Sequence, residues 1–530
     1  MSDTPNQRPL WLQQLLHGPH ALAPDASCTE THISWVVLAG EQAVKFKKPL
    51  DMGFLNFSTL ALRHHACLEE LRINARTAPQ LYQCVVAVLG SQEAPRLVPV
   101  AQLTAAQQAE VIEYGVQMQR FGADQLLAQQ LAAGQLETSH LSALAEQVAQ
   151  LHAQAAVAPA GSDWGSPAAV RQQSQANLDA LARLPLSDAD RATLAALSDW
   201  TQQEGERLMP LFAQRQQDGH VREGHGDLHL GNLVLLDGTP QLFDAIEFSE
   251  SLRWIDTVAD GAFLVMDLHA QGRPDLAWHF LNAWLEQSGD YASLPLLPWY
   301  LVYRALVRAM VAGFRLDQVQ GEAAQAQVWQ EVRRYMALAE QLRQPRPRWL
   351  WLAHGVSGSG KSRHSARLVA ERGMVRLRAD AERKRLFGLA PTASSVGAVP
   401  GGIYTPEASQ RTYQRLAQLA AQVLQAGFPV LVDATFLAQG QRAQLLAVAA
   451  QQQVPCRILA FDAPPEVLRE RVQRRLAKGG NPSEATLEVL EAQLAAREPL
   501  NAAEQALTVL ADTTQDLDWN ALLPLNPTLA

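Results

Sequence analysis

The clearest chemical pattern in the chain lies at residues 355–362, which read G-x-x-x-x-G-K-S. An apolar stretch precedes this pattern and a helical pattern follows it, which is the context of a phosphate-binding loop. Its glycines let backbone N–H groups surround phosphates, its lysine neutralises the β- and γ-phosphates, and its serine hydroxyl ligates Mg²⁺. The residues predicted to bind ATP and Mg²⁺ in this way are Gly355, Val356, Ser357, Gly358, Ser359, Gly360, Lys361 and Ser362.

Two aspartates downstream are candidates for the same site. Asp433 ends an apolar run, so it is predicted to face the same crevice and to hold Mg²⁺. Asp380 follows a predicted strand and precedes Arg383, which suits an acid that accepts a hydroxyl proton beside a cation that holds an anionic acceptor. The sequence leaves two alternatives open, namely a plain strand-end aspartate at 433 and a helix cap at 380.

Two arginines further along the chain are candidates for a lid. Arg471 and Arg475 are four residues apart and share one face of a predicted helix. Such a face can close cations over a transferring phosphate. A solvated basic helix is the alternative interpretation.

A second pattern lies upstream, where residues 225–232 read H-G-D-L-H-L-G-N and residues 242–247 read L-F-D-A-I-E. Two acids with an asparagine five residues after the first make a Mg²⁺ site chemically reasonable. In protein-kinase chemistry an aspartate accepts the hydroxyl proton, while such an asparagine and a second aspartate hold the metal. Asp227 is therefore the predicted base, and Asn232 and Asp244 are the predicted metal ligands.

The elements that must position these residues differ between the two halves. Residues 32–50 alternate as a β-hairpin whose second strand puts Lys45 and Lys47 on one face, and a helical pattern over 58–78 carries Glu69 and Glu70. Mostly helical patterns follow. Beyond the prolines of R-Q-P-R-P-R, strand and helix patterns alternate, as in a parallel α/β sheet.

These patterns predict two domains. The first covers residues 1–342, with a small lobe over about 25–118 and a large lobe over about 119–342, and the second covers 349–530 after a linker at 343–348. The glycine-rich run over 389–402 is predicted to be either a mobile substrate loop or a disordered insertion.

Composition limits the function classes. The 530 residues carry a net charge of −9, which argues against generic nucleic-acid binding. No apolar run is long enough to span a membrane, and the N-terminus lacks a signal-peptide pattern, so we expect a soluble, cytoplasmic protein. Only six of the 44 basic residues are lysines, and four of those are Lys45, Lys47, Lys48 and Lys361, which is typical of phosphate contact.

The C-terminal motifs resemble those of the small P-loop kinases, a group that includes gluconate kinase, the zeta toxins, chloramphenicol phosphotransferase and the kinase part of polynucleotide kinase. The resemblance covers about residues 348–515. It implies an α/β P-loop kinase fold with a parallel sheet, with Asp380 as the base and Arg471 or Arg475 as the lid cation.

The N-terminal motifs resemble those of the aminoglycoside phosphotransferase and choline kinase family over about residues 30–340. The resemblance implies an α+β protein-kinase-like fold, ATP, Mg²⁺ and a hydroxyl acceptor. It implies that Lys45, or Lys47, contacts the α- and β-phosphates, that Glu70, or Glu69, orients this lysine, and that the segment around Glu113 is the adenine hinge.

One departure from this family is that the hairpin lacks a G-x-G-x-x-G loop. The whole chain looks like a group of bacterial proteins of unassigned function that join these two modules in this order. The leading hypothesis is an ATP- and Mg²⁺-dependent phosphotransferase that acts on a hydroxyl of a small polar molecule. The alternatives are a nucleotide-regulated binding, defence or toxin-related protein and, in the C-terminal domain, a nucleic-acid end kinase.

Overall fold

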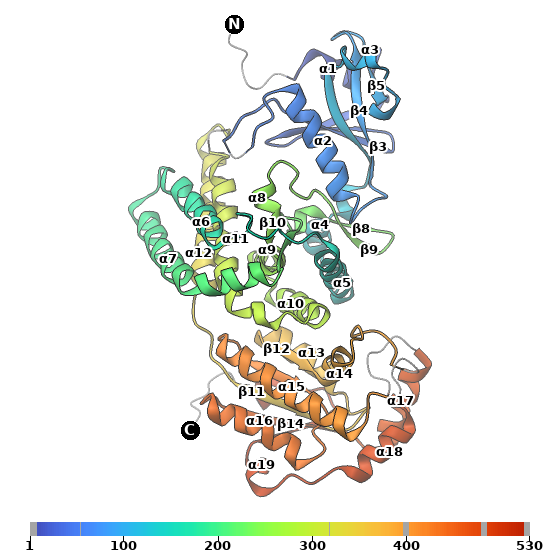
Figure 1. Ribbon diagram of the computed structural model, residues 1–530, viewed down its shortest axis with the longest axis vertical. Helices are drawn as coiled ribbons and strands as arrows, with labels where there is room; N and C mark the ends of the chain where they lie inside the picture. Colours follow the sequence, from blue (N-terminus) through green and yellow to red (C-terminus); the bar gives the residue numbers. More distant parts are fainter. Residues whose placement is uncertain (1–7, 54, 317, 396–401, 479–484, 524–530) are drawn as a thin grey trace. The chain divides into compact units, whose positions relative to one another are not determined.

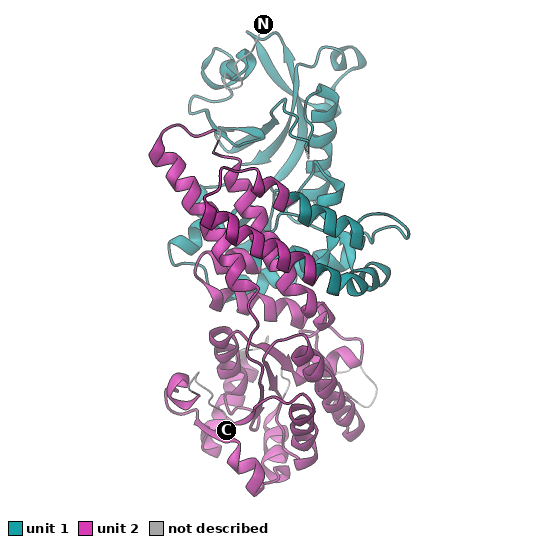
Figure 2. Cartoon of the chain, turned by 90° about the vertical axis from the view of Figure 1, so that its left-hand side faces the viewer, with its two compact units in different colours: residues 1–176, 205–264 teal, residues 177–204, 265–530 magenta. Residues whose placement is uncertain are grey.

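The computed structural model describes residues 8–53, 55–316, 318–395, 402–478 and 485–523 (Figure 1). The chain divides into two compact units, residues 1–176 with 205–264 and residues 177–204 with 265–530 (Figure 2). Residues 396–401 of the predicted glycine-rich run lie outside the described residues. The division groups residues 265–342 with the P-loop part, so the predicted boundary at 343–348 stays a prediction.

A six-stranded antiparallel sheet forms the start of the first unit, in the order β1-β2-β3-β6-β4-β5. Its strands are β1 Ser27–Glu30, β2 Ser34–Ala39, β3 Gln42–Lys47, β4 Tyr82–Gly90, β5 Pro95–Pro99 and β6 Glu113–Gln119. Strands β2 and β3 confirm the predicted hairpin, and at its turn Gly40 has φ of 55°. Only glycine adopts such an angle freely.

The two faces of this sheet are covered by different helices. Helix α1 (Leu10–His17) packs Trp11 against Val44 and Phe46 of β3. Helix α2 (Leu60–Asn74) is capped by the Thr59 side chain and covers the opposite face. Because side chains alternate along a strand, Lys45 and Lys47 of β3 face α2.

The remainder of the first unit is helical, with two short strand pairs. Its elements are η1 Val100–Gln102, α3 Ala105–Gln108, η2 Ala123–Gln125, α4 Leu127–Ala132, α5 Thr138–Gln154, β7 Val221–Glu223, η3 Leu230–Asn232, β8 Leu233–Leu236, β9 Thr239–Leu242, α8 Glu250–Arg253 and β10 Trp254–Asp256. Strands β8 and β9 pair as an antiparallel hairpin within this mostly helical part. Helices α6 Pro167–Ala182, α7 Asp188–Gln217 and α9 Thr257–Ala270 belong partly to each unit.

The second unit opens with helices and ends in a parallel sheet. The helices are α10 Pro274–Ser288, η4 Tyr291–Leu296, α11 Leu297–Gly313 and α12 Glu322–Leu342. The five strands, in the order β12-β13-β11-β14-β15, are β11 Leu350–His354, β12 Val375–Arg378, β13 Val430–Asp433, β14 Cys456–Asp462 and β15 Thr508–Asp512. All described residues of β11 are buried, as expected for a central strand with helices on both faces.

The helices of the parallel sheet follow the predicted alternation of strands and helices. They are α13 Lys361–Arg372, α14 Ala379–Leu386, α15 Pro406–Gln425, α16 Gln439–Gln451, α17 Pro465–Lys478, α18 Leu487–Ala496, α19 Ala502–Ala506 and α20 Trp519–Leu522. Strand β11 runs into residues 355–360 and then into α13. This strand, loop and helix order places the glycine-rich motif at the carboxyl edge of the sheet, where α/β proteins bind ligands.

Candidate phosphotransfer sites

The loop at residues 355–360 has a backbone that requires its glycines. Gly355, Gly358 and Gly360 have φ angles of 148°, 82° and 85°. A Cβ on Gly355 would lie 2.4 Å from the carbonyl oxygen of Phe461, and one on Gly358 would lie 2.7 Å from that of Leu468. Substitution at either position therefore strains the backbone and forces a neighbouring strand or helix to move.

A cavity of about 1090 Å³ adjoins this loop. It brings together most of the residues predicted for the C-terminal site, which are Ser357, Gly358, Gly360, Lys361, Ser362, Asp380, Arg383, Asp433, Arg471 and Arg475. They come from four segments of sequence, and the parallel sheet explains their meeting because β11, β12 and β13 end at one edge. The arrangement provides one lysine and several guanidinium groups around two carboxylates.

Lys361 is buried and donates to the carbonyl oxygen of Val356 at 2.9 Å. Burial lowers the pKa of this ammonium to about 8, although the charges of Asp433 and Asp380 oppose that shift. A buried cation whose charge is incompletely balanced gains most from an added anion. The positive charge of Lys361 therefore favours binding of an anion such as phosphate at this loop.

Asp433 carries an unusual buried oxygen. Within the described residues its Oδ2 atom has no hydrogen-bond partner. A buried, unpaired carboxylate oxygen is costly unless a ligand, an ion or water satisfies it. This oxygen fits Mg²⁺ or a water bound to Mg²⁺, and Ser362 at the start of α13 supplies a hydroxyl to the same cavity.

The arginines around the cavity have different partners. Arg471 donates to the hydroxyl and carbonyl oxygens of Thr513, both at 2.8 Å. Arg475 donates to the carbonyl oxygen of Ala485 at 2.8 Å, but its Nε has no partner within the described chain. Arg383 lies 3.4 Å from Asp380 and 4.9 Å from the ring centre of Tyr404, and its buried Nε is also unpaired. Arg383 and Arg475 therefore each have an N–H group that can donate a hydrogen bond to a bound anion.

In the first unit the two candidate lysines meet a single glutamate. Lys45 Nζ lies 2.8 Å from one oxygen of Glu70, and Lys47 Nζ lies 2.5 Å from the other. Lys47 is fully buried and also pairs with Glu247, whereas Lys45 is slightly exposed and pairs with Asp244. The exposed fraction and the contact with Asp244 make Lys45 the lysine that a ligand can reach.

Asp244 has a left-handed backbone conformation, with φ of 59°. Such angles are uncommon outside glycine and concentrate at functional positions. Its amide N–H donates to the Tyr82 hydroxyl at 3.0 Å, and its side chain is about one third exposed. The turn thus presents a carboxylate beside Lys45.

The loop at residues 225–232 holds its predicted base by two side chains. The Asn232 amide donates to the carbonyl and Oδ2 oxygens of Asp227 at 2.9 and 2.8 Å, which leaves the asparagine oxygen as a potential metal ligand. His229 accepts from Gly231 through Nδ1, so its Nε2–H points 3.3 Å from Asp227 Oδ2. Asp227 and Asn232 are therefore brought together as predicted.

Asp260 is a residue of this site that the sequence analysis missed. It is buried in α9, accepts from the backbone N–H groups of His225 and Gly226 at 2.8 and 3.0 Å, and contacts His152 at 3.2 Å. Burial opposes ionisation, but the bonds from His152 and the loop lower the pKa of Asp260 to about 2. A lone aspartate in a helical pattern gives no sequence signal for such a role.

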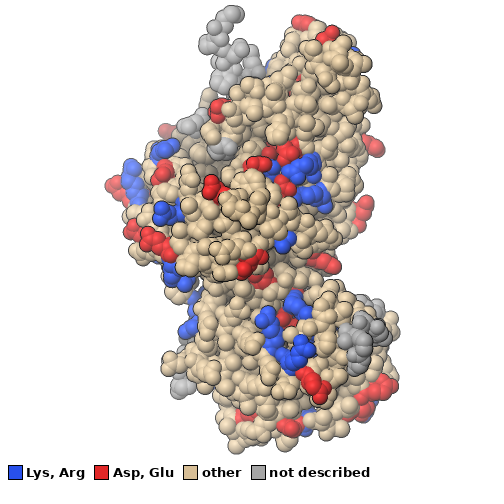
Figure 3. All heavy atoms as spheres, viewed as in Figure 1, with Lys and Arg blue, Asp and Glu red and all other residues tan. Residues whose placement is uncertain are grey.

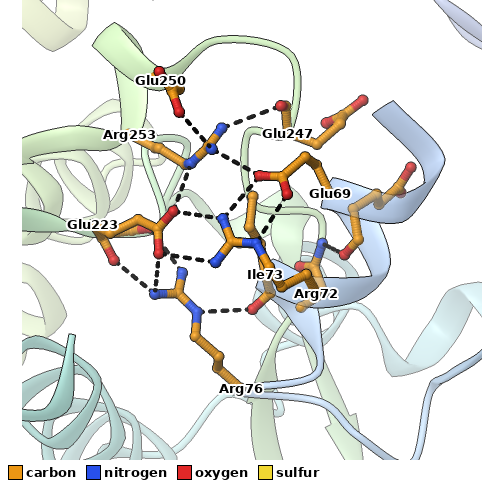
Figure 4. Close-up of polar contacts among 11 residues, drawn as sticks. Glu69, Arg72, Ile73, Arg76, Glu223, Glu247, Glu250 and Arg253 are labelled. Carbon is orange, nitrogen blue, oxygen red and sulfur yellow. Dashed lines mark hydrogen bonds and ion pairs between the residues drawn. The ribbon is translucent and has the colours of Figure 1, made fainter. Parts of the chain in front are cut away.

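A cluster of charges joins helix α2 to Glu223 of β7 and Arg253 of α8 (Figure 4). Arg72 lies 2.6 Å from Glu223 and 2.8 Å from Glu69, and Arg253 bonds the same two glutamates at 3.0 and 2.9 Å. Arg76 donates to the carbonyl oxygen of Glu223 at 2.9 Å. Glu69 thus belongs to this cluster, and Glu70 is the residue that meets the lysines.

Glu113, predicted at the hinge, lies apart from the residues above. It begins β6, and both of its carboxylate oxygens accept from Arg63 Nε at 2.9 Å. The pair is buried. The hinge assignment stays a prediction.

Within the described ranges, no three His, Cys, Asp or Glu side chains converge as a metal-binding group. Fewer than three such side chains are sufficient for Mg²⁺ at the P-loop site and at the site of the first unit. Mg²⁺ is commonly held by one or two carboxylates together with substrate phosphates and water. Asp433 with Ser362, and Asp244 with Asn232, are the side chains that would hold it. Among the described helices, none is sufficiently long and apolar to cross a membrane.

Comparison with known proteins extends these observations. The family of AAA domains matches residues 350–500. Solved structures with similarity include a sugar kinase from Janibacter sp. HTCC2649, with 25% identity, 32% of this chain and 88% of that chain covered, and a TM-score of 0.25. A choline/ethanolamine kinase family protein from Mesorhizobium loti has 12% identity, 63% and 97% coverage, and a TM-score of 0.35.

The fold and the sites define a class, a fusion of an α+β part built on an antiparallel sheet with a C-terminal α/β P-loop domain of the AAA type. The chain is 32% identical over 476 residues to uncharacterised proteins of Mycobacterium tuberculosis and Mycobacterium bovis, and the match covers 90% of each chain. It belongs to the same family as these proteins.

Proposed function

We propose that this protein is an ATP- and Mg²⁺-dependent phosphotransferase that moves the γ-phosphate of ATP to a hydroxyl of a small polar molecule. The observation that carries the proposal is the cavity at the P-loop, where Lys361, Asp380, Asp433 and two lid arginines meet. Kinase-like folds in both regions support the reaction class.

The P-loop cavity supports specific roles for its side chains. Lys361 and the loop N–H groups would bind the β- and γ-phosphates, and Ser362 and Asp433 would hold Mg²⁺, which neutralises charge on the phosphates. Asp380 would accept the acceptor's hydroxyl proton. Arg475, whose Nε is unpaired, is suited to bind the transferring phosphate.

The acceptor side of this cavity favours an anionic molecule. Arg383 is buried with an unpaired Nε and stacks on Tyr404 beside Asp380. A carboxylate or phosphate on the acceptor would satisfy those donors and place a nearby hydroxyl against Asp380. Basic side chains also gather on the visible surface over α14 and α15 (Figure 3), which supports an oligonucleotide end as the alternative acceptor.

The first unit supports a second phosphotransfer site. Asp227 would be its base, Asn232 and Asp244 its metal ligands, and Lys45, oriented by Glu70, its phosphate-binding lysine. The direct pairing of Lys45 with Asp244 also supports a regulatory site that binds nucleotide without transfer. Both proposals require ATP at this site.

The test is ADP formation by wild type, Lys361→Ala and Asp227→Ala with sugars, nucleosides, aminoglycosides, sugar acids and oligonucleotide ends, followed by product mass. We expect stimulation by an acceptor whose mass rises by one phosphate, and loss of that stimulation in one of the two variants. ATP turnover without any phosphorylated product would contradict the proposal and favour a regulatory ATPase.

A further inference from the structure

The edge strand β12 leads directly into Asp380, and it is covered by a helix from a distant part of the sequence. Within the second unit, the Asn282 side chain on α10 donates to the carbonyl oxygen of Met374 at 2.9 Å and accepts from the N–H of Arg376 at 2.6 Å. The amide therefore pairs with the strand as a neighbouring strand would. An edge strand otherwise presents unpaired backbone groups.

Glu286, one helical turn further along α10, balances two cations of the same strand. Its Oε1 accepts from Arg378 at 2.6 Å, and its Oε2 lies 3.6 Å from Arg376. Both arginines lie on one side of β12, because alternate residues of a strand share a face. Glu286 is largely buried, so its charge acts at close range and with little screening.

The end of α10 is joined to α14 as well. Arg385 donates to the carbonyl oxygen of Glu286, which is one of the unpaired carbonyls of the last turn. Gly289 follows with φ of 72°, and a Cβ there would lie 2.6 Å from Arg385 Nε. The contact thus depends on a glycine at this helix end.

Arg378 connects these contacts to the P-loop cavity. It lines that cavity, it pairs in strand register with Asp433, and it precedes Asp380 by two residues. Asp433 and Asp380 both attract its guanidinium. Among the described residues, the carboxylate of Glu286 is the hydrogen-bond partner of Arg378. It therefore opposes a movement of Arg378 onto Asp433, the predicted Mg²⁺ ligand, and Asp380, the predicted base.

We propose that α10 is part of the P-loop site, in which Glu286 is a positioning residue that holds Arg378 away from Asp433 and Asp380, while Asn282 fixes strand β12. The inference rests on the proposed function of this site. It adds that the site is completed by residues from before the predicted linker at 343–348.

The test uses the full-length chain and Glu286→Gln, which keeps the shape of the side chain but removes its charge. Arg378 then competes with Mg²⁺ for Asp433, so the Mg²⁺ concentration for half-maximal ATP turnover rises by about 5- to 10-fold, and ATP affinity changes by less than about 2-fold. Glu286→Asp should restore part of the Mg²⁺ response. A purely structural role would lower turnover without a shift in Mg²⁺ dependence.

The matched control is Glu331→Gln on α12, because Glu331 accepts from Arg315 at the same 2.6 Å and neither residue lines the cavity. It should leave the Mg²⁺ dependence unchanged. An unchanged Mg²⁺ dependence in Glu286→Gln would overturn the proposal.

A second measurement is independent of turnover. Amide hydrogen exchange of residues 374–386 should become faster in Asn282→Ala and Glu286→Gln and stay unchanged in Glu331→Gln. If wild type shows no ATP turnover, the proposed function fails, and exchange still decides whether α10 positions this segment. Equal exchange in all variants would overturn the inference.

Discussion

Lys45 and Lys361 are both predicted to contact phosphates, but their surroundings differ in charge. Burial would lower the pKa of Lys45, yet Asp244 and Glu70 raise it well above its usual value. Burial lowers the pKa of Lys361 to about 8, because the nearby carboxylates compensate less fully. A phosphate that binds at the P-loop therefore balances the charge of Lys361. A phosphate that binds at Lys45 must replace Asp244 or Glu70 as its partner, or share Lys45 with them.

The largest effect should come from the lysine that is entirely enclosed. Lys47→Met leaves Glu70 and Glu247 buried beside a single remaining cation, so the free energy of unfolding should fall by about 3–5 kcal/mol. Denaturant unfolding monitored by tryptophan fluorescence measures this change. The neighbouring Lys48→Met, which loses a pair with the more exposed Glu30, should cost less than about 1 kcal/mol. Equal losses in the two variants would contradict a structural role for the buried Lys47.

Loss of the Asp260 charge should destabilise the loop at residues 225–232 by less than the loss of Lys47 destabilises the protein. Asp260→Asn keeps the shape but replaces one of the two oxygens that accept from backbone N–H groups by an NH₂ donor, which should cost about 1–3 kcal/mol. Faster amide exchange at residues 225–227, with the P-loop segment unaffected, is the expected result. If exchange at 225–227 stays at the wild-type rate, Asp260 does not hold this loop.

The charge state of Lys361 predicts a pH dependence for the second site. Bound phosphate favours the ammonium, and the lowered pKa of about 8 means that the free protein loses this proton as the pH rises through 8. Affinity for MgATP should therefore be constant below pH 8 and should fall by up to about 10-fold per pH unit above it. Titration calorimetry at pH 7 to 9.5 measures this trend.

The control for this trend is Lys361→Arg, whose charge does not titrate in the range. Its MgATP affinity, whatever its absolute value, should not vary between pH 7 and 9.5 by more than the assay error. A parallel fall in both proteins would assign the pH dependence to another group.

The smallest effect should separate the lid arginines. Arg475 has an unpaired Nε, whereas Arg471 is bound to Thr513 and Arg474 is exposed and pairs with Glu470. Arg475→Gln should lower the rate of ADP formation by about 5- to 10-fold, and Arg474→Gln by less than about 2-fold. Equal rates in the two variants would favour the alternative interpretation from the sequence, in which Arg475 belongs to a solvated basic helix and does not contact phosphate.

Local patterns in the sequence were sufficient for the residues that act within one motif. The glycine spacing predicted the loop at 355–360, and alternation predicted that Lys45 and Lys47 share a face. The elements near the predicted sites, such as the hairpin and the parallel strands, were also recognisable because their periodicity is strong. The sequence could not decide between Glu69 and Glu70 as the partner of the lysine, since both lie on one turn of α2.

Residues that act across long sequence separations could not be predicted. Asp260 contacts a loop 34 to 35 residues earlier, and Asn282 contacts a strand 92 to 94 residues later. Each is one of several polar side chains in a largely apolar helix, and its spacing does not distinguish it from the others. Only the packing of the helices shows which backbone groups these side chains satisfy.

The most direct test of the account is ADP formation from MgATP by wild type and Lys361→Met in the presence of the stimulating acceptor. Lys45→Met is measured under the same conditions. The account predicts that Lys361→Met lowers P-loop turnover by at least about 100-fold, as loss of a phosphate-binding cation does, while the protein stays folded. Wild-type turnover and product formation in Lys361→Met would contradict the assignment of phosphotransfer to the P-loop cavity.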